Sequence, residues 1–110
     1  NVKDNFTIMK EEPFGPLVPI LSFKDFDEII ERSNKNDLGL CSYICTNSMD
    51  QAHRASELME TGTVAVNTPV VALAEAPFGG IKQTGYGREG GSMAIKDYLN
   101  IKYTHLGIKG

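Results

Sequence analysis

A carboxylate and an aromatic ring stand two positions apart in the segment EEPFGP, residues 11–16. Its prolines disfavour helix, so Glu12 and Phe14 are expected to project to the same side of an extended chain. A carboxylate in this arrangement can accept two vicinal ribose hydroxyls while the ring covers a flat heterocycle. A solvated Glu beside a buried Phe is the other interpretation, since exposed carboxylates are the rule. The segment alone leaves both open.

A second candidate is GYGREG, residues 85–90, which matches the GxGxxG pattern of dinucleotide-binding loops. That pattern binds pyrophosphate when it follows a buried strand, whereas Lys82, Gln83 and Thr84 precede it here. No acidic residue stands about 20 positions further on to take the ribose hydroxyls. We therefore expect these glycines to serve a loop that needs positive φ angles and close backbone approach.

The two thiols, Cys41 and Cys45, are expected to be structural core residues and not nucleophiles. No cationic residue adjoins them, and neither lies on a glycine-rich turn or helix start that would lower a thiol pKa. Their spacing on a strand is too long for an easy disulfide. His53 and His105 are isolated from other ligand types, so no metal site is expected.

Alternating strand-like and helix-like segments must position these side chains. Apolar runs predict strands at residues 17–21, 40–46 and 63–66. Between them, Asp25 with Glu28 and Ser48 with Gln51 mark two helix starts, and Gly62 is expected to end the second helix in a left-handed conformation. This order predicts an α/β unit whose strands pair in parallel through right-handed crossovers.

The span of residues 67–91 has no convincing period and contains six of the glycines. Structureless loops of this length are uncommon inside compact domains unless they are functional. After it, Ser92 is expected to cap a short helix through Tyr98, and residues 101–106 alternate like a strand.

Composition limits the partners. The chain has 110 residues, 41% of them hydrophobic, and a net charge of -3 with scattered Lys and Arg, which argues against nucleic acid. No apolar run approaches the roughly 20 residues that span a bilayer. The abrupt start at Asn1 is interpreted as a cut boundary, and two unpaired thiols without a visible signal segment favour a cytoplasmic location.

Four stretches together resemble the NAD(P)-dependent aldehyde dehydrogenase family: EEPFGP at 11–16, DLGL at 37–40, GTVAVN at 62–67 and PFGGIKQTGYGREGG at 77–91. The resemblance implies that residues 1–100 form the C-terminal part of the catalytic domain, a parallel-sheet α/β unit. It implies that residues 101–110 are an oligomerisation strand and tail. The nucleophilic Cys and the basic Glu of the family precede this stretch, so the 110 residues alone are expected to be inactive.

The resemblance also assigns roles to single residues. Glu12 corresponds to the carboxylate that holds the nicotinamide ribose of NAD or NADP, and Phe14 to the aromatic beside the nicotinamide. Residues 67–78 correspond to the loop at the aldehyde entrance, which makes four side chains candidate substrate contacts: Val70, Ala72, Leu73 and Phe78. Residues 101–106 correspond to the strand that crosses between subunits of homodimers and homotetramers.

Within the family, residues 82–91 and 95–110 most resemble the succinate-semialdehyde dehydrogenase branch. In that branch a serine of the pocket loop meets the distal carboxylate, whereas this chain has no hydroxyl between Pro69 and Phe78. Either another residue supplies that contact, or the preferred aldehyde is less polar. A non-catalytic α/β binding or assembly module, with Glu12 as a solvated surface group, is the alternative function.

Overall fold

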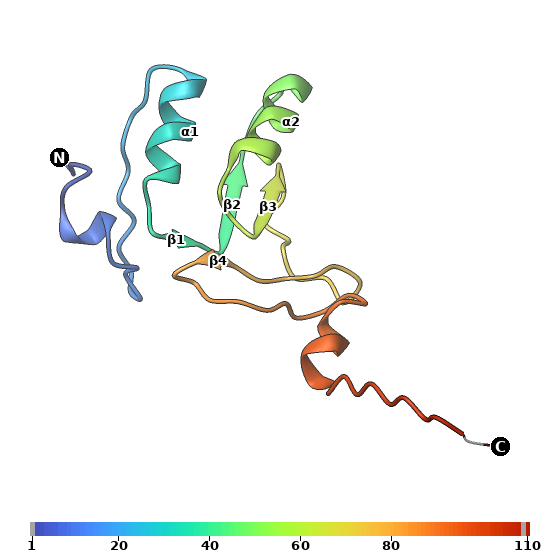
Figure 1. Cartoon of the computed structure of the whole chain (residues 1–110). Helices are drawn as coiled ribbons and strands as arrows, with labels where there is room; N and C mark the ends of the chain where they lie inside the picture. Colours follow the sequence, from blue (N-terminus) through green and yellow to red (C-terminus); the bar gives the residue numbers. More distant parts are fainter. Residues whose placement is uncertain (1, 109) are drawn as a thin grey trace.

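The computed structural model describes residues 2–108 and 110 (Figure 1). It has two α-helices, α1 (Phe26–Asn34) and α2 (Met49–Leu58), and two short 3-10 helices, η1 (Thr7–Met9) and η2 (Ala94–Tyr98). Its strands are β1 (Leu38–Gly39), β2 (Cys41–Ile44), β3 (Thr63–Val66) and β4 (Ile81–Lys82). Within the described residues, no helix is long and apolar enough to cross a bilayer.

The unit β2-α2-β3 is the part of the fold that the sequence predicted best. β2 and β3 pair in parallel, with Cys41 opposite Thr63 and Ile44 opposite Val66. The Ser48 hydroxyl accepts a hydrogen bond from the amide of Gln51 at 3.3 Å, which caps α2 as expected. The buried apolar side chains of the described chain are small: Ala52, Ala55 and Ala65.

The cap of α1 is also confirmed. Asp25 accepts from the amide of Glu28 at 2.9 Å, and the Glu28 carboxylate reaches back to the amide of Lys24 at 2.8 Å. Arg32 ties this helix to the N-terminal segment, because its guanidinium lies 2.8 Å from Asp4. It also pairs within the helix with Glu28 at 3.0 Å. The hydrogen bond from Arg32 holds the pKa of the Asp4 carboxyl below its ordinary value, and Asp4 raises the pKa of Arg32.

A second ladder makes the sheets mixed. β1 pairs antiparallel with β4, so that Leu38 lies opposite Lys82 and Gly39 opposite Ile81. The predicted strand of residues 40–46 is therefore shorter than expected and is preceded by β1, which pairs with a different partner. The β4 partner lies inside the span of residues 67–91, which showed no periodicity because a two-residue strand is too short to produce any.

The predicted strand at residues 17–21 is wrong. The segment has no strand partner among the described residues, and Val18 and Ile20 are 81% and 83% exposed. The prediction of a Ser92 cap is also wrong, because η2 begins at Ala94 after Met93 and has no side-chain cap. The apolar residues of 17–21 lack a neighbouring strand in the described chain. Ser92 lies too far before the start of η2 to cap it.

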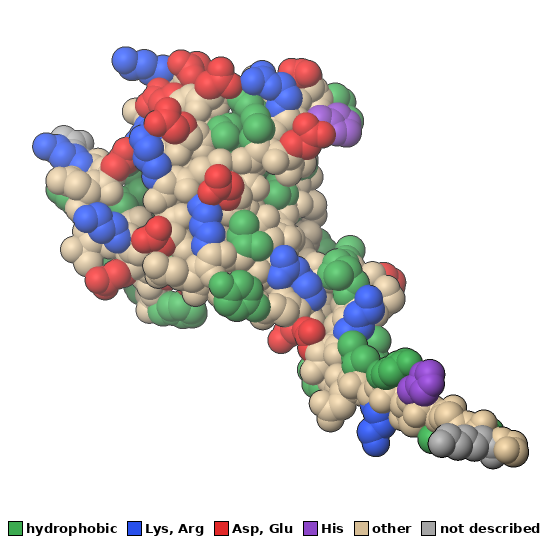
Figure 2. Space-filling model, viewed as in Figure 1, with side chains coloured by type: hydrophobic (Ala, Val, Ile, Leu, Met, Phe, Trp, Pro, Cys, Tyr) green, Lys and Arg blue, Asp and Glu red, His purple; other side chains and the backbone are tan. Residues whose placement is uncertain are grey.

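Residues 101–108 project from the body as an extended tail (Figure 1). No strand is assigned there in the described chain, and Ile101 and Ile108 are 100% and 93% exposed. Figure 2 shows hydrophobic side chains spaced along this tail. The accessible surface is 9211 Å², whereas a compact monomer of this mass exposes about 6,000 Å². Much apolar surface of the chain is therefore available for contact with other protein.

Candidate functional site

The centre of the candidate site is Phe78, the second residue of the PFGG corner (residues 77–80) in the long loop. Its backbone pairs with that of Glu89 in both directions, with N to O distances of 2.7 Å. The exchange of two hydrogen bonds holds these residues opposite each other, although they are far apart in the loop. Two hollows open beside this pair, and both Phe78 and Glu89 line each of them.

The first hollow, of about 250 Å³, collects most of the predicted substrate residues. It is lined by Ala72, Leu73, Ala74, Phe78, Glu89 and Gly90. The predicted Val70 is 55% exposed and lies outside it. Sequence reasoning did not identify Ala74, Glu89 or Gly90, because the pairing of residues 78 and 89 leaves no local signal. The side chains that residues 72–78 contribute to this hollow are apolar, and Glu89 adds a carboxylate to its lining.

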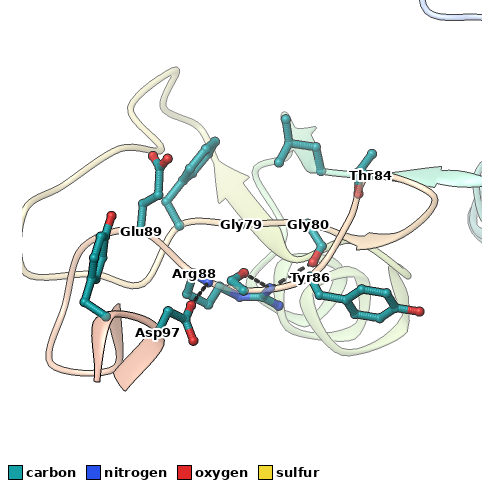
Figure 3. A pocket seen from close by; sticks show the side chains of 11 residues that line it. Gly79, Gly80, Thr84, Tyr86, Arg88, Glu89 and Asp97 are labelled. Atoms are coloured by element: carbon teal, nitrogen blue, oxygen red, sulfur yellow. Dashed lines mark hydrogen bonds between the residues drawn. The ribbon is translucent and has the colours of Figure 1, made fainter. Parts of the chain in front are cut away.

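The second hollow, of about 310 Å³, lies over the glycine-rich turn (Figure 3). The Arg88 guanidinium closes that turn by donating to the carbonyl oxygens of Gly80 at 2.8 Å and Gly87 at 2.7 Å. Asp97 accepts from the backbone amide of Arg88 at 3.2 Å, which ties the turn to η2. The Tyr86 side chain points away from these contacts and is 99% exposed. The turn is therefore closed by hydrogen bonds from the Arg88 side chain to backbone carbonyl oxygens.

The glycines of the GxGxxG pattern have the loop role that the sequence predicted. Gly85, Gly87 and Gly90 have φ angles of 101°, 87° and 68°, which side chains disfavour. A Cβ on Gly90 would also lie 2.7 Å from the Ala76 carbonyl oxygen. The pattern serves backbone conformation and close approach, which confirms that explanation of its glycines.

The predicted left-handed stop at Gly62 is wrong, and a different constraint explains this glycine. Gly62 does not have a positive φ angle. A Cβ built there would lie 1.9 Å from the carbonyl oxygen of Gly79. The turn before β3 therefore lies against the PFGG corner, backbone to backbone, and positions it.

The candidate cofactor residues lie apart from both hollows. Glu12 and Phe14 occupy an irregular, exposed segment, and Phe14 is 94% exposed. Among the described residues, the Glu12 carboxylate has no hydrogen-bond partner. The chain presents both groups at its surface and does not by itself bring them to the substrate residues.

The thiols and imidazoles form no reactive cluster. Both cysteines are free; Cys41 is half-buried on β2, but Cys45 is exposed, so the prediction that it is a core residue is wrong. Cys45 follows Ile44, the last residue of β2, and has no neighbouring strand residue of its own in the described chain. His105 contacts the Tyr103 hydroxyl at 3.1 Å on the tail, and His53 is exposed on α2. Across residues 2–108 and 110, no group of three or more His, Cys, Asp or Glu is placed to hold a metal.

Known proteins resemble this chain over nearly its whole length. The sequence profile described as "Aldehyde dehydrogenase family" matches residues 1–104. The chain is 45% identical to a glutarate-semialdehyde dehydrogenase of Pseudomonas aeruginosa, over 97% of the chain and 22% of that protein. It is 42% identical to the succinate-semialdehyde dehydrogenase [NADP(+)] GabD of Escherichia coli, over 98% of the chain and 22% of that protein.

A solved structure shares the fold. The NAD+ complex of an aldehyde dehydrogenase from Bacillus cereus superposes with a TM-score of 0.91 at 41% identity. The superposition covers 99% of this chain and 22% of that one. The chain thus spans about a fifth of the length of the proteins it matches.

Proposed function

The chain belongs to the aldehyde dehydrogenase family, and we propose that it is one part of an enzyme that oxidises an aldehyde to a carboxylic acid with NAD or NADP. The observation that carries the proposal is the convergence of Ala72, Leu73 and Phe78 on one hollow. The resemblance to the family predicts these three residues as substrate contacts, and their apolar side chains suit the tail of an aldehyde.

The proposed reaction divides between this chain and the remainder of the enzyme. A cysteine thiolate adds to the aldehyde carbonyl to give a thiohemiacetal, whose hydride would pass to the oxidised cofactor and leave a thioester. Water activated by a glutamate then cleaves the bond between sulfur and carbon and releases the acid and the thiol. The chain spans 22% of its relatives, and the proposal places that cysteine and that glutamate in the other part. Cys41 and Cys45 take no part in it, because neither free thiol forms a hydrogen bond with a basic side chain in the described residues.

The side chains of Glu12 and Phe14 suit a nicotinamide nucleoside. Glu12 offers a carboxylate without a hydrogen-bond partner in the described residues, and Phe14, which is 94% exposed, offers an aromatic ring. In the proposal, the Glu12 carboxylate accepts from the two ribose hydroxyls and thereby orients the nucleoside. The ring of Phe14 covers one side of the nicotinamide and excludes water there. The bound cofactor supplies a hydride acceptor.

The aldehyde itself is a semialdehyde or a less polar relative. The succinate- and glutarate-semialdehyde dehydrogenases among the relatives favour the former. Within residues 70–77, however, the ionisable side chain is Glu75, and there is no hydroxyl or cation for a distal carboxylate. If the substrate is a semialdehyde, its carboxylate binds to residues outside this loop.

The C-terminal tail is proposed to join subunits. Residues 101–107 are extended, exposed and without a strand partner in the described chain. We assign them to strand addition across a subunit interface, which gives a homodimer or homotetramer. Two free thiols suit a reducing compartment, and the proposal locates the enzyme in the cytoplasm.

Cofactor reduction by the purified full-length protein tests this function. Absorbance of the reduced cofactor should rise with an aldehyde panel that includes succinate semialdehyde, glutarate semialdehyde and unsubstituted aldehydes of the same chain lengths. Each is assayed with NAD and with NADP. Absence of aldehyde-dependent reduction with every pair would contradict the proposal, and the ranking of the aldehydes chooses between the two substrate classes.

A further inference from the structure

Residues 67–82, called the pocket loop from here on, begin and end at residues with left-handed backbone. Asn67 and Lys82 both have a φ angle of 56°, and they are the non-glycine residues with positive φ in the described chain. Such a conformation is uncommon outside glycine, is tolerated by Asn, and is unusual for Lys. It persists only where surrounding contacts determine it. The candidate substrate residues all lie between these two positions.

At the first end of the loop, Asn67 forms hydrogen bonds with Thr46, two residues after the end of β2. Its side-chain carbonyl accepts from the amide of Thr46 at 3.0 Å, and its side-chain amide donates to the Thr46 carbonyl at 2.8 Å. The backbone amide of Asn67 donates to Ile44 at 2.8 Å. The exit of β3 is therefore bound to the end of β2 by three hydrogen bonds.

At the second end, the ammonium of Lys82 joins three separate segments. Nζ donates to the carbonyl oxygens of Asn34 at 2.7 Å and Asn36 at 3.0 Å, at the C-terminus of α1. It also lies 2.6 Å from Oε2 of Glu60, in the turn between α2 and β3, and its side chain is only 23% exposed. A cation is favoured at a helix C-terminus, and three donors match three acceptors.

These contacts join the two ends of the loop to the body of the fold. The candidate substrate residues lie between the two ends. Neither Asn67 nor Lys82 lines either hollow. Phe78 lies four residues before Lys82, on the direct route from that anchor through Gly79 and Gly80. Displacement of the anchor therefore shifts the ring that both hollows share.

We propose that Asn67 and Lys82 are positioning residues for the aldehyde, which fix the two ends of the loop of residues 67–82 and so set its selectivity. The inference rests on the proposed function for its kinetic consequence. Its structural consequence, a loop whose mobility depends on the two anchors, is independent of any reaction.

The test compares Lys82→Met with Lys82→Arg and Lys35→Met in the full-length protein. Met keeps much of the length and removes the charge, Arg retains donors for the carbonyls, and Lys35 is an exposed lysine near the same helix end paired with Glu31. Lys82→Met should raise KM for the aldehyde about fivefold or more while KM for the cofactor changes by less than about twofold. Lys82→Arg should recover at least half of that loss, and Lys35→Met should match the wild type.

Hydrogen exchange of the amides of residues 68–80 gives a second measurement on the same proteins. Exchange should be faster in Lys82→Met, and also in Asn67→Gly, which keeps the left-handed backbone accessible but loses both contacts to Thr46. If the wild type oxidised no aldehyde, the proposed function would fail and exchange would still decide the role of the anchors. Should Lys82→Met not fold, Glu60→Gln removes the charge from one of the three acceptors of Lys82 and should show smaller changes in the same direction.

Two results would overturn the inference. One is exchange of residues 68–80 at the wild-type rate in the folded variant. The other is a rise of both KM values by the same factor together with a lower melting temperature, which indicates general destabilisation and not positioning.

Discussion

Gly62 and Gly79 are in backbone contact: a Cβ on Gly62 would lie 1.9 Å from the carbonyl oxygen of Gly79 and 2.9 Å from the Cα of Gly80. The turn that leads into β3 thus packs directly against the backbone of the PFGG corner. No side chain separates the two segments, so any atom added at Gly62 must displace the corner that carries Phe78.

Gly62→Ala should therefore destabilise the protein and disturb the aldehyde site together. Overpacking of this kind costs about 1 to 3 kcal/mol in the free energy of unfolding, and KM for the aldehyde should rise more than KM for the cofactor. Denaturant unfolding and steady-state kinetics of the full-length protein measure both. Gly110→Ala is the control for stability, because nothing lies within 4 Å of a Cβ there and the residue lies outside the proposed interface strand. Equal stability of the two variants would contradict the contact.

Glu12→Gln should slow productive hydride transfer. The change replaces a charge-assisted contact to the ribose, worth about 1.5 to 3 kcal/mol, with a neutral one, so kcat or kcat/KM for the cofactor should fall about tenfold or more. Glu11→Gln, at the adjacent exposed carboxylate, is the matched control and should retain wild-type kinetics. If single-turnover rates were the same in both variants, Glu12 would be an ordinary surface residue.

Replacement of the two thiols should leave turnover intact. Cys45 is exposed, so Cys45→Ser should change the free energy of unfolding by less than about 0.5 kcal/mol. Cys41 is half-buried on β2, and Cys41→Ser should cost more but stay within about 3 kcal/mol. Assays of kcat with the full-length protein check the chemistry, and loss of turnover in either folded variant would identify that thiol as part of the reaction.

Truncation after Leu99 should dissociate the enzyme or make it aggregate. The tail exposes Ile101, Tyr103 and Leu106 at 100%, 84% and 82%, and its backbone groups have no partner strand in the described chain. Light scattering at micromolar concentration measures the particle mass. Lys102→Ala preserves the backbone that strand addition uses and should keep the wild-type mass. An unchanged mass and melting temperature after truncation would place the tail within its own subunit.

The ion pair between Asp4 and Arg32 should contribute stability only when the carboxyl is ionised. Arg32 lowers the pKa of Asp4 in the folded chain relative to the unfolded chain, so the contribution is present above about pH 4 and is lost as pH falls through the folded pKa. Asp4→Asn should therefore be less stable than wild type near neutral pH and converge with it in acid. Glu57→Gln, an exposed carboxylate on α2, is the control. A difference that persisted in acid would exclude ionisation as its cause.

The capped helices and the parallel pair were accessible from the sequence because each depends on nearby residues. Asp25 and Ser48 accept from amides three positions ahead, and that spacing is visible in one dimension. The unit β2-α2-β3 follows because a helix between two strands brings them together in parallel. The wall residues Ala72, Leu73 and Phe78 came from the resemblance, and the structure adds that they share a hollow.

Tertiary structure alone decided the features that depend on distant partners. Gly62 has the residue type of a helix stop, yet its neighbour is Gly79, and a contact between two backbones leaves no pattern in either segment. Residues 17–21 have strand composition but no strand beside them in the described chain, so their composition is not realised as a sheet. The left-handed backbone of Lys82 likewise requires Asn34, Asn36 and Glu60 to meet in space. Local order follows from residue spacing, whereas these positions follow from long-range contacts that form only when the chain folds.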